Sequence, residues 1–340
     1  MRQRTRRFLR ASVWRGGRYC RAGPDAGGAG SGAARSCGTV CRQFFFRHLR
    51  TGRQLPRGTG RRRRAISLRD SGIGTLAARL AGSLGLRGPD FSFNTACTAS
   101  ANALVAAIRQ VECGLLEHAL VLGAELYNDV SALGFHGLGL LTESVMAPFD
   151  ANRDGLVLGE GVSALVIGRA TASQTGGFYL RGSASTSDTH SITASNPDGS
   201  TIADVMRAAL DNAGMTAAQV DAVKVHGTAS LSNDEAESAG MQQVFDRLPP
   251  VCALKPHIGH TLGACGLNEL VLFCAAVEAG FLVATPGISA RAGDLGVTLN
   301  QEPAPVSTGT FMLNYFGFGG NNASLLVGNE PRRDPTVAVM

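Results

Sequence analysis

The sequence predicts an α/β protein whose sheets are covered by helices on both faces. Apolar strand-like runs alternate with helix-like segments along most of the chain, and glycines stand where the helices should stop. The 340 residues, with 44% hydrophobic and 6% aromatic content, fit a globular protein of this class. Because the alternation occurs twice, we expect two related halves that share one site.

The first half is predicted over residues 65–168. Its expected elements, in order, are a helix at 73–84 ended by Gly85, a strand at 91–93, a helix at 98–113 ended by Gly114, a strand at 119–122, a glycine-rich loop at 134–139 and a strand at 159–167. This order gives the strand-helix-strand units of a mainly parallel sheet.

The second half is predicted over residues 169–330, and residues 331–340 form a tail. Its expected elements are a strand at 177–181, a helix at 201–213 ended by Gly214, a strand at 222–225, a helix at 234–245, a strand at 251–254, a helix at 260–279, and strands near 311–313 and 323–327. The helices that begin near residues 98 and 260 are rich in Ala and Gly, as suits a helix packed on all sides.

Residues 1–64 differ in composition from the rest of the chain. They hold 18 arginines, no lysine and one acidic residue, whereas residues 65–340 carry 25 acidic and 14 basic residues. The segment lacks apolar periodicity, so we expect disorder. A basic arm could bind nucleic acid or a membrane surface, or serve as a transit peptide. The Arg/Gly/Ala bias instead favours a stretch without function, read in a shifted frame. Nucleic-acid binding is disfavoured because aromatic residues are not interleaved along the arm and the body is acidic.

The cysteines and the apolar runs indicate a cytoplasmic protein without a metal or cofactor. Most of the eight cysteines lie in apolar helix or strand contexts, which is typical of reduced, buried thiols. Cys37 and Cys41 have the spacing of half a zinc site, but no second pair follows. The apolar stretch at 270–284 is interrupted by Glu278 and Gly280, so we expect a buried helix there and no membrane span.

Cys97 is a candidate nucleophile. It lies between a predicted strand and a predicted helix, so free backbone N–H groups and the helix dipole would favour its thiolate. The alternative is a buried cysteine that only fills space.

Two histidines, one lysine and one glutamate strengthen the candidate site. His226 ends a predicted strand, at the edge of the sheet where α/β proteins place their sites. His260 is predicted to begin a helix, whose dipole disfavours the imidazolium and leaves a neutral hydrogen-bond donor. Lys255 is predicted to end the preceding strand and requires an anionic partner if buried. Glu269, nine residues after His260, suggests pairing with an interior cation. A structural role remains the alternative for His226.

From about residue 68 to 328 the chain resembles the elongating class of β-ketoacyl-acyl carrier protein synthases, which have the thiolase fold. The motifs that carry the resemblance are TACTAS at 95–100, PFDANRDGLVLGEG at 148–161, HGTASLSNDEAE at 226–237, KPHIGHTLGACGLNE at 255–269 and NYFGFGGNNAS at 314–324. The resemblance implies two halves with mixed sheets in a layered α-β-α-β-α arrangement.

The resemblance also implies roles for individual residues. Cys97 would accept the acyl group, and His226 and His260 would serve malonyl decarboxylation, with Lys255 and Glu269 in the supporting polar network. The further residues implied are Phe318 as gate and, with Cys97, as backbone donor to an oxyanion, Thr228 and Ser230 as contacts of the pantetheine or malonyl group, and Phe135 as lining of the acyl pocket. Ordinary core packing remains an alternative for Phe135.

The implied function is a decarboxylative Claisen condensation in fatty acid or polyketide-like biosynthesis, which makes the chain an acyltransferase. The expected partners are acyl- and malonyl-loaded acyl carrier protein and a second copy of the chain. His260 in the third catalytic place favours the elongating class over thiolases and over enzymes with a Cys-His-Asn triad. Cys97 argues against a chain-length factor.

The chain departs from the family pattern before residue 68. The family carries a strand-helix-strand stretch there, and we do not find it in residues 1–67. The first half is therefore expected to be incomplete, with apolar surface uncovered. The alternative function is a truncated, non-catalytic remnant or a homologue that only binds carrier protein. Ala229 and Leu231 also depart from the family pattern, beside the predicted substrate contacts.

Overall fold

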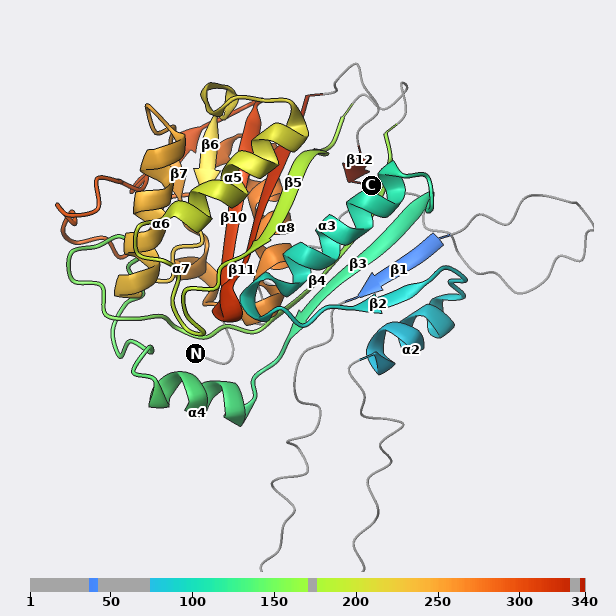
Figure 1. Ribbon diagram of the computed structural model, residues 1–340, viewed down its shortest axis with the longest axis horizontal. Coiled ribbons are helices and arrows are strands. Elements are labelled where there is room, and N and C mark those ends of the chain that lie inside the picture. Colours follow the sequence, from blue (N-terminus) through green and yellow to red (C-terminus); the bar gives the residue numbers. More distant parts are fainter. Residues whose placement is uncertain (1–36, 42–73, 171–175, 331–336, 340) are drawn as a thin grey trace, which may run out of the picture.

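A ten-stranded mixed sheet runs through the molecule (Figure 1). The computed structural model describes residues 37–41, 74–170, 176–330 and 337–339, with only the backbone given for 37–41. In sheet order the strands are β2 (Asp90–Ser92), β1 (Cys37–Cys41), β3 (His118–Glu125), β4 (Gly161–Arg169), β12 (Val337–Val339), β5 (Tyr179–Ser187), β11 (Asn321–Gly328), β10 (Thr310–Gly317), β6 (Ala222–Lys224) and β7 (Val251–Cys252). The predicted α/β class is confirmed. A separate short ladder pairs β8 (Phe281–Leu282) with β9 (Ala304–Pro305).

Parallel pairing is confined to the two ends of the sheet. Strand β1 pairs in parallel with β2 and β3, and β6 pairs in parallel with β7 and β10. The central pairs are antiparallel, including those of β12 with both β4 and β5. Strand β12 therefore connects the strands of the two halves into one continuous sheet. The mainly parallel sheet expected from the alternation of elements is wrong for the centre of this sheet.

Seven α-helices of the described residues surround these strands. They are α2 (Thr75–Leu84), α3 (Ala99–Glu112), α4 (Asp129–Gly137), α5 (Ser200–Ala213), α6 (Leu231–Val244), α7 (Lys255–Ile258) and α8 (Cys265–Glu278). Helix α3, from the first half, contacts β5 and β11 of the second, while α8 contacts β3 and β4 of the first. Figure 1 shows α5 in front of the second half and α4 apart from the strands. The helices α3 and α8 also pack on each other, so they form the layer between the halves.

Helix ends follow the predicted glycine signals, but one predicted loop is a helix. Gly85 and Gly214 adopt φ values of 66° and 60° and end α2 and α5, as expected of glycine in the left-handed region. The glycine-rich loop predicted at 134–139 instead contains the end of α4. Asn128 caps this helix, because its Oδ1 accepts a hydrogen bond from the Ser131 N–H at 2.7 Å. The cap offsets the low helix propensity of the glycines.

The segments that carry the predicted site also differ locally from expectation. His260 does not begin a helix: its N–H donates to Val157 O at 2.7 Å, and α8 starts five residues later. Lys255 begins the short helix α7 and does not end strand β7. Helix α6 starts at Leu231, earlier than the predicted residue 234. For His260, backbone hydrogen bonds with the distant segment 157–159 decide the difference.

Strand β1 corrects the prediction for part of residues 1–64. Residues Cys37–Cys41 lie between β2 and β3 in the sheet, where the sequence suggested no ordered element. The other residues before Gly74 lie outside the described part of the chain, so the predicted disorder and shifted frame stay untested for them. The boundaries proposed for the two halves also stay predictions.

A turn and helix unit occurs once in each half. The 3-10 turn Ala96–Thr98 (η3) precedes α3, and the 3-10 turn Leu262–Ala264 (η5) precedes α8; both helices have 14 residues. Ala96 and Leu262 adopt positive φ values of 47° and 43°. Two equivalent hydrogen bonds brace the units, from Asn102 Nδ2 to Thr95 Oγ1 at 2.8 Å and from Asn268 Nδ2 to Thr261 Oγ1 at 3.1 Å. The halves are thus related in local detail.

Glycine permits the close approach of these two units. A Cβ on Gly266 of α8 would lie 2.4 Å from the backbone nitrogen of Ala101 in α3. The atoms nearest to this position are the backbone nitrogen and Cβ of Ala101 and the hydroxyl of Ser100, none of which can move far. Any residue larger than glycine at position 266 would therefore push the two helices apart. The contact sets the distance between the two turns that carry the candidate site.

Candidate active site

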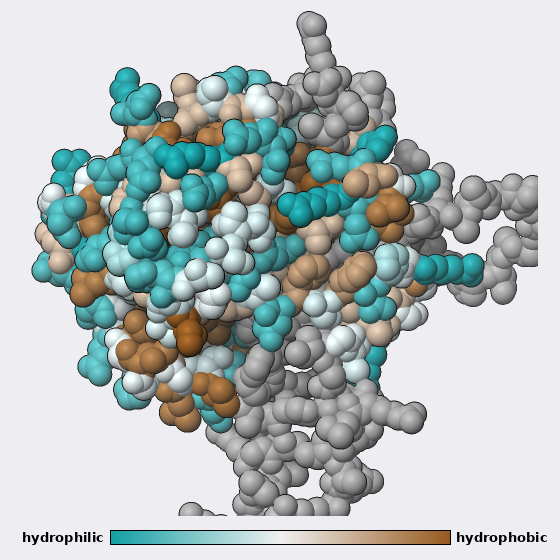
Figure 2. All heavy atoms as spheres, viewed as in Figure 1, coloured by the Kyte–Doolittle hydropathy of each residue, from teal (hydrophilic) through white to brown (hydrophobic). Residues whose placement is uncertain are grey.

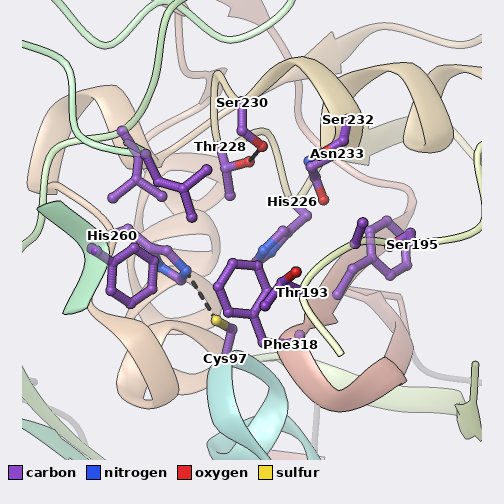
Figure 3. A pocket seen from close by; sticks show the side chains of 16 residues that line it. Cys97, Thr193, Ser195, His226, Thr228, Ser230, Ser232, Asn233, His260 and Phe318 are labelled. Carbon is purple, nitrogen blue, oxygen red and sulfur yellow. Dashed lines mark hydrogen bonds between the residues drawn. The ribbon is translucent and has the colours of Figure 1, made fainter. Parts of the chain in front are cut away.

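Cys97 lies in the 3-10 turn before α3, at a pocket lined by residues from both halves (Figure 3). Its side chain is 6% exposed. The predicted residues His226, Thr228, Ser230, His260, Phe135 and Phe318 all line the same pocket. Lys255 and Glu269 lie behind it, fully buried. The structure therefore gathers residues that are up to 221 positions apart in the chain around one sulfur atom.

His260 faces the sulfur directly. Its Nε2 atom lies 3.2 Å from Cys97 Sγ, the contact drawn as a dashed line in Figure 3. The backbone of His260 is held by pairing with the segment around Leu158. Cys265, the first residue of α8, donates its S–H to Cys97 O at 3.0 Å, which ties the second turn to the first. The geometry is that of a thiol and an imidazole able to exchange or share a proton.

His226 follows β6 and lies edge-on to His260, with the ring centres 5.4 Å apart. Its Nδ1 lies 3.1 Å from Lys255 Nζ, and Lys255 also donates to its backbone oxygen at 2.6 Å. An ammonium can only donate, so Nδ1 of a neutral His226 is the acceptor. The proton of that imidazole is then on Nε2, the ring nitrogen on the opposite side of the ring from Lys255.

Both histidines are held neutral by their surroundings. Burial lowers the pKa of His226 well below its usual 6.5, and the positive charges of Lys255 and Lys224 and the neighbouring titratable ring of His260 lower it further. Burial likewise places the pKa of His260 well below 6.5, with Lys255 and Lys224 as further causes. The predicted neutral imidazole of His260 thus has a different cause from the one inferred, because His260 is not at a helix N-terminus.

A buried group of two lysines and one carboxylate supports His226. Lys255 Nζ lies 2.8 Å from Glu269 Oε1, and Lys224 Nζ lies 2.6 Å from Glu269 Oε2. All three side chains are 0% exposed. Burial is the largest single effect on the pKa of Lys255 and lowers it, but Glu269, with smaller contributions from Cys265 and Glu237, gives a net pKa that is raised. For Lys224 burial prevails, and its pKa is lowered. The anionic partner expected for Lys255 is therefore Glu269.

The pocket walls are aromatic on one side and polar on the other. The rings of Phe135 and Phe318 stack with centres 5.6 Å apart and an interplanar angle of 9°. Opposite them, the hydroxyls of Thr228 and Ser230 lie 3.0 Å apart. An apolar chain would fit against the rings and a polar one against the hydroxyls.

The backbone near Gly317 is close to the nucleophile. A Cβ at Gly317 would lie 3.3 Å from the nitrogens of both Cys97 and Thr98, so the chain that leads into Phe318 passes directly beside these amides. The predicted use of the Cys97 and Phe318 N–H groups as oxyanion donors stays a prediction.

Three charged residues of the site were not singled out as site residues from the sequence. Lys224 is the other of the only two lysines in the chain, and it ends a buried strand, which is a signal that was available. Glu237 accepts hydrogen bonds from the N–H groups of His226 and Gly227 at 2.7 and 2.9 Å. Burial raises the pKa of Glu237 to about 7 and that of Asp234 to about 6. Their spacing of three residues at the start of a helix was the available signal.

The donor atoms of Cys97, His226 and His260 lie within 4.8 Å of one another, close enough in principle for one metal ion. The two buried ammonium groups behind His226 oppose a divalent cation at this place. The expectation that the site holds no metal stays a prediction. Apart from Cys97, the free cysteines of the described residues are Cys113, Cys252, Cys265 and Cys274.

Comparisons with known proteins agree with the motifs. The model of the β-ketoacyl synthase N-terminal domain matches residues 29–173, and that of the C-terminal domain matches residues 178–289. A mitochondrial relative from Schizosaccharomyces pombe is 32% identical over 254 residues, which cover 68% of this chain and 59% of the relative. The chain thus spans less than two thirds of that protein's length.

Two further similarities extend this result. The 3-oxoacyl-[acyl-carrier-protein] synthase 2 of Vibrio cholerae is 30% identical over 280 residues, covering 74% of this chain and 66% of the relative. A ketosynthase of Xenorhabdus doucetiae, solved in complex with its chain length factor, superposes with a TM-score of 0.77 at 27% identity, covering 87% of this chain and 75% of that one. From its two domain matches and its thiolase-like fold, the chain belongs to the β-ketoacyl synthase family.

Proposed function

We propose that the chain catalyses the decarboxylative condensation of an acyl thioester with malonyl-acyl carrier protein, giving a 3-ketoacyl product. The observation that supports this most strongly is the convergence of one thiol and two neutral imidazoles, Cys97, His226 and His260, at one pocket. A simple hydrolase needs one base beside its nucleophile. Two neutral imidazoles suit a reaction in which an enolate oxygen must be stabilised.

The first half-reaction loads the thiol. The sulfur of Cys97 attacks the acyl carbonyl, the carbon–sulfur bond to the carrier breaks, and the carrier leaves as a thiol after protonation. His260, at 3.2 Å from the sulfur, is placed to accept the thiol proton. The backbone N–H groups of Cys97 and Phe318 would hold the oxyanion of the tetrahedral intermediate.

The second half-reaction forms the new bond. Malonyl thioester loses CO2, and the electron pair of the broken carbon–carbon bond passes into an enolate. The Nε2–H of His226 would donate a hydrogen bond to the enolate oxygen, and His260 would donate a second one in the neutral tautomer that carries its proton on Nε2. The carbanion then attacks the acyl carbonyl on Cys97, and the Cys97 thiolate is expelled. The hydroxyls of Thr228 and Ser230 would bind the pantetheine or malonyl end at the polar wall.

The test is a direct assay of the full chain. The chain is incubated with acyl- and malonyl-loaded carrier protein, and the protein species are measured by intact-protein mass spectrometry. Each turnover should yield one CO2 and one 3-ketoacyl-carrier protein. A transient mass increase on Cys97 equal to the acyl group is expected when malonyl carrier is omitted. If carrier protein binds but neither acylation nor CO2 release occurs, the alternative of a non-catalytic, carrier-binding homologue is correct.

Phe135 is proposed to limit the acyl chain. Its ring covers Phe318, so a long chain must displace the stack or stop against it. Phe135→Ala should increase kcat/KM for longer acyl thioesters relative to short ones by about tenfold, because removing the ring opens apolar space. Competition between short and long acyl carriers measures the ratio. Phe281→Ala, which changes an exposed ring that is not part of the pocket lining, is the control and should leave the ratio unchanged.

A second copy of the chain is proposed to cover α4. This helix has no buried residue, although Phe135 on it lines the pocket. Figure 2 shows apolar side chains gathered over α4, and the large apolar residues exposed there are Leu126, Tyr127, Val130, Leu133 and Leu138. Apolar surface of this kind is typical of an interface. The Xenorhabdus doucetiae ketosynthase binds a chain length factor, so such a partner is the other occupant to test.

Leu133→Asp should convert a dimer of the chain into monomers, because the charge would be buried in an apolar contact. Leu133 is 69% exposed in the single chain, and Leu115, at the opposite end of β3, is 68% exposed. Leu115→Asp is therefore a matched control that should leave the mass unchanged. Sedimentation of the two variants and the unchanged chain gives the result. A monomer in all three would contradict the homodimer.

None of the helices that the structure describes is long and apolar enough to cross a membrane. The cytoplasmic location inferred from the sequence stays a prediction.

A further inference from the structure

We propose that Lys224 is a positioning residue of this active site, which holds Glu269 and Lys255 in place behind His226 and adds a second buried positive charge beside both histidines. Its effect on catalysis rests on the condensing function proposed above. Its effect on the histidines does not depend on that function, because it acts through the ion pairs of Glu269 and through the buried charge.

Lys224 joins three elements of the fold. It is the last residue of β6, its Nζ contacts Glu269 Oε2 of α8 at 2.6 Å, and it donates to Asn314 O of β10 at 2.8 Å. Its ammonium lies 3.7 Å from the centre of the Tyr315 ring. The contacts with Glu269, Asn314 and Tyr315 together fix the Lys224 side chain in the buried interior.

The contacts continue from Lys224 to the pocket. Glu269 uses one oxygen for Lys224 and the other for Lys255, and Lys255 contacts both Nδ1 and the backbone oxygen of His226. A carboxylate bound on both oxygens cannot rotate away from Lys255. Lys224 therefore fixes the position from which Lys255 holds the tautomer of His226.

Lys224 also changes the charge of this region. One lysine and one glutamate would form a neutral pair, whereas two lysines and one glutamate leave one positive charge in the interior. Positive charge there disfavours the imidazolium and favours anions in the pocket, such as a thiolate or an enolate. Lys224 is one cause of the lowered pKa of both His226 and His260.

Other titratable groups act on the same region. Those coupled electrostatically to Lys224 are Glu269 and Cys265 on α8, Lys255 on α7, Cys252 on β7 and Glu237 on α6, with Tyr315 on β10 beneath the ammonium. Burial keeps the thiols of Cys252 and Cys265 and the phenol of Tyr315 neutral by raising their pKa values. Among these groups the charged ones are the two lysines, Glu269 and, in part, Glu237.

The variant Lys224→Met removes the positive charge and keeps a side chain of similar length. The variant Lys224→Arg keeps the positive charge. Histidine ¹³C NMR titration of the full chain should show the midpoints of His226 and His260 higher by about one pH unit in the Met variant, since one of the causes that lower them is removed. The Arg variant should stay close to the unchanged chain. The acid limb of kcat should move to higher pH by the same amount, with KM for the carriers nearly constant.

The two lysines offer a measurement without any substitution. Because the chain contains only Lys224 and Lys255, ¹³Cε-lysine labelling gives two signals. Both should have the shift of an ammonium at pH 7, and Lys224 should lose its proton first as the pH rises. A neutral amine at pH 7 would overturn the proposal, as would histidine midpoints that do not move in a folded Met variant. Both NMR results stand even if the chain proves not to condense malonyl groups.

Discussion

Cys97→Ala should lower the condensation rate by about three orders of magnitude or more, because no other group can carry the acyl chain between the two half-reactions. Release of CO2 from malonyl carrier should persist, since His226 and His260 keep their contacts with Lys255 and with the pocket. Product formation and CO2 release, measured on the same samples, separate these two steps.

The matched control is Cys113→Ala. Cys113 is also a free cysteine, but it is exposed at the end of α3, whereas Cys97 is buried in the 3-10 turn that precedes the same helix. Its replacement should leave both rates unchanged. Condensation that survives in the Cys97 variant would show that the thiol is structural, and the assignment of the nucleophile would be lost.

Glu269→Gln should destabilise the fold by about 3–5 kcal/mol, the largest loss of stability expected from a single polar substitution in this chain. The change leaves Lys224 and Lys255 buried with no carboxylate between them, and an uncompensated buried charge is costly. Chemical denaturation followed by circular dichroism measures the difference in unfolding free energy.

Glu278→Gln provides the comparison on the same helix. Glu278 is exposed at the end of α8, so the same chemical change should alter stability by no more than about 0.5 kcal/mol. Equal effects of the two substitutions would mean that Glu269 does not carry the charge of the buried group.

The parts of the fold that depend on short stretches of sequence could be predicted. Glycines at 85 and 214 end helices as expected, and the apolar run before His226 forms the strand that places this histidine at the pocket. These features are determined by residues within a few positions of each other. The cysteine and the two histidines could be placed together because their motifs occur in the order of a known family.

Features that depend on distant contacts could not be predicted. The ion pair of Lys224 with Glu269 joins residues 45 positions apart, and nothing in either local sequence indicates that one carboxylate serves two lysines. His260 was placed at the start of a helix because its local pattern allows one, but hydrogen bonds to Val157 and Gly159 hold it extended. Helix α4 differs from the predicted loop because a single capping residue, Asn128, prevails over the two glycines within the helix, Gly134 and Gly137.

The matching turns before α3 and α8 each present one of the proposed reactive residues, but at different positions of the unit. Counting from the bracing threonine, the first unit has its reactive residue two positions later, at Cys97, where the second has Gly263. The second unit has its reactive residue one position earlier, at His260, where the first has Asn94. The two units are alike in backbone and bracing but present their proposed reactive side chains at different positions, so the pocket needs one unit from each half.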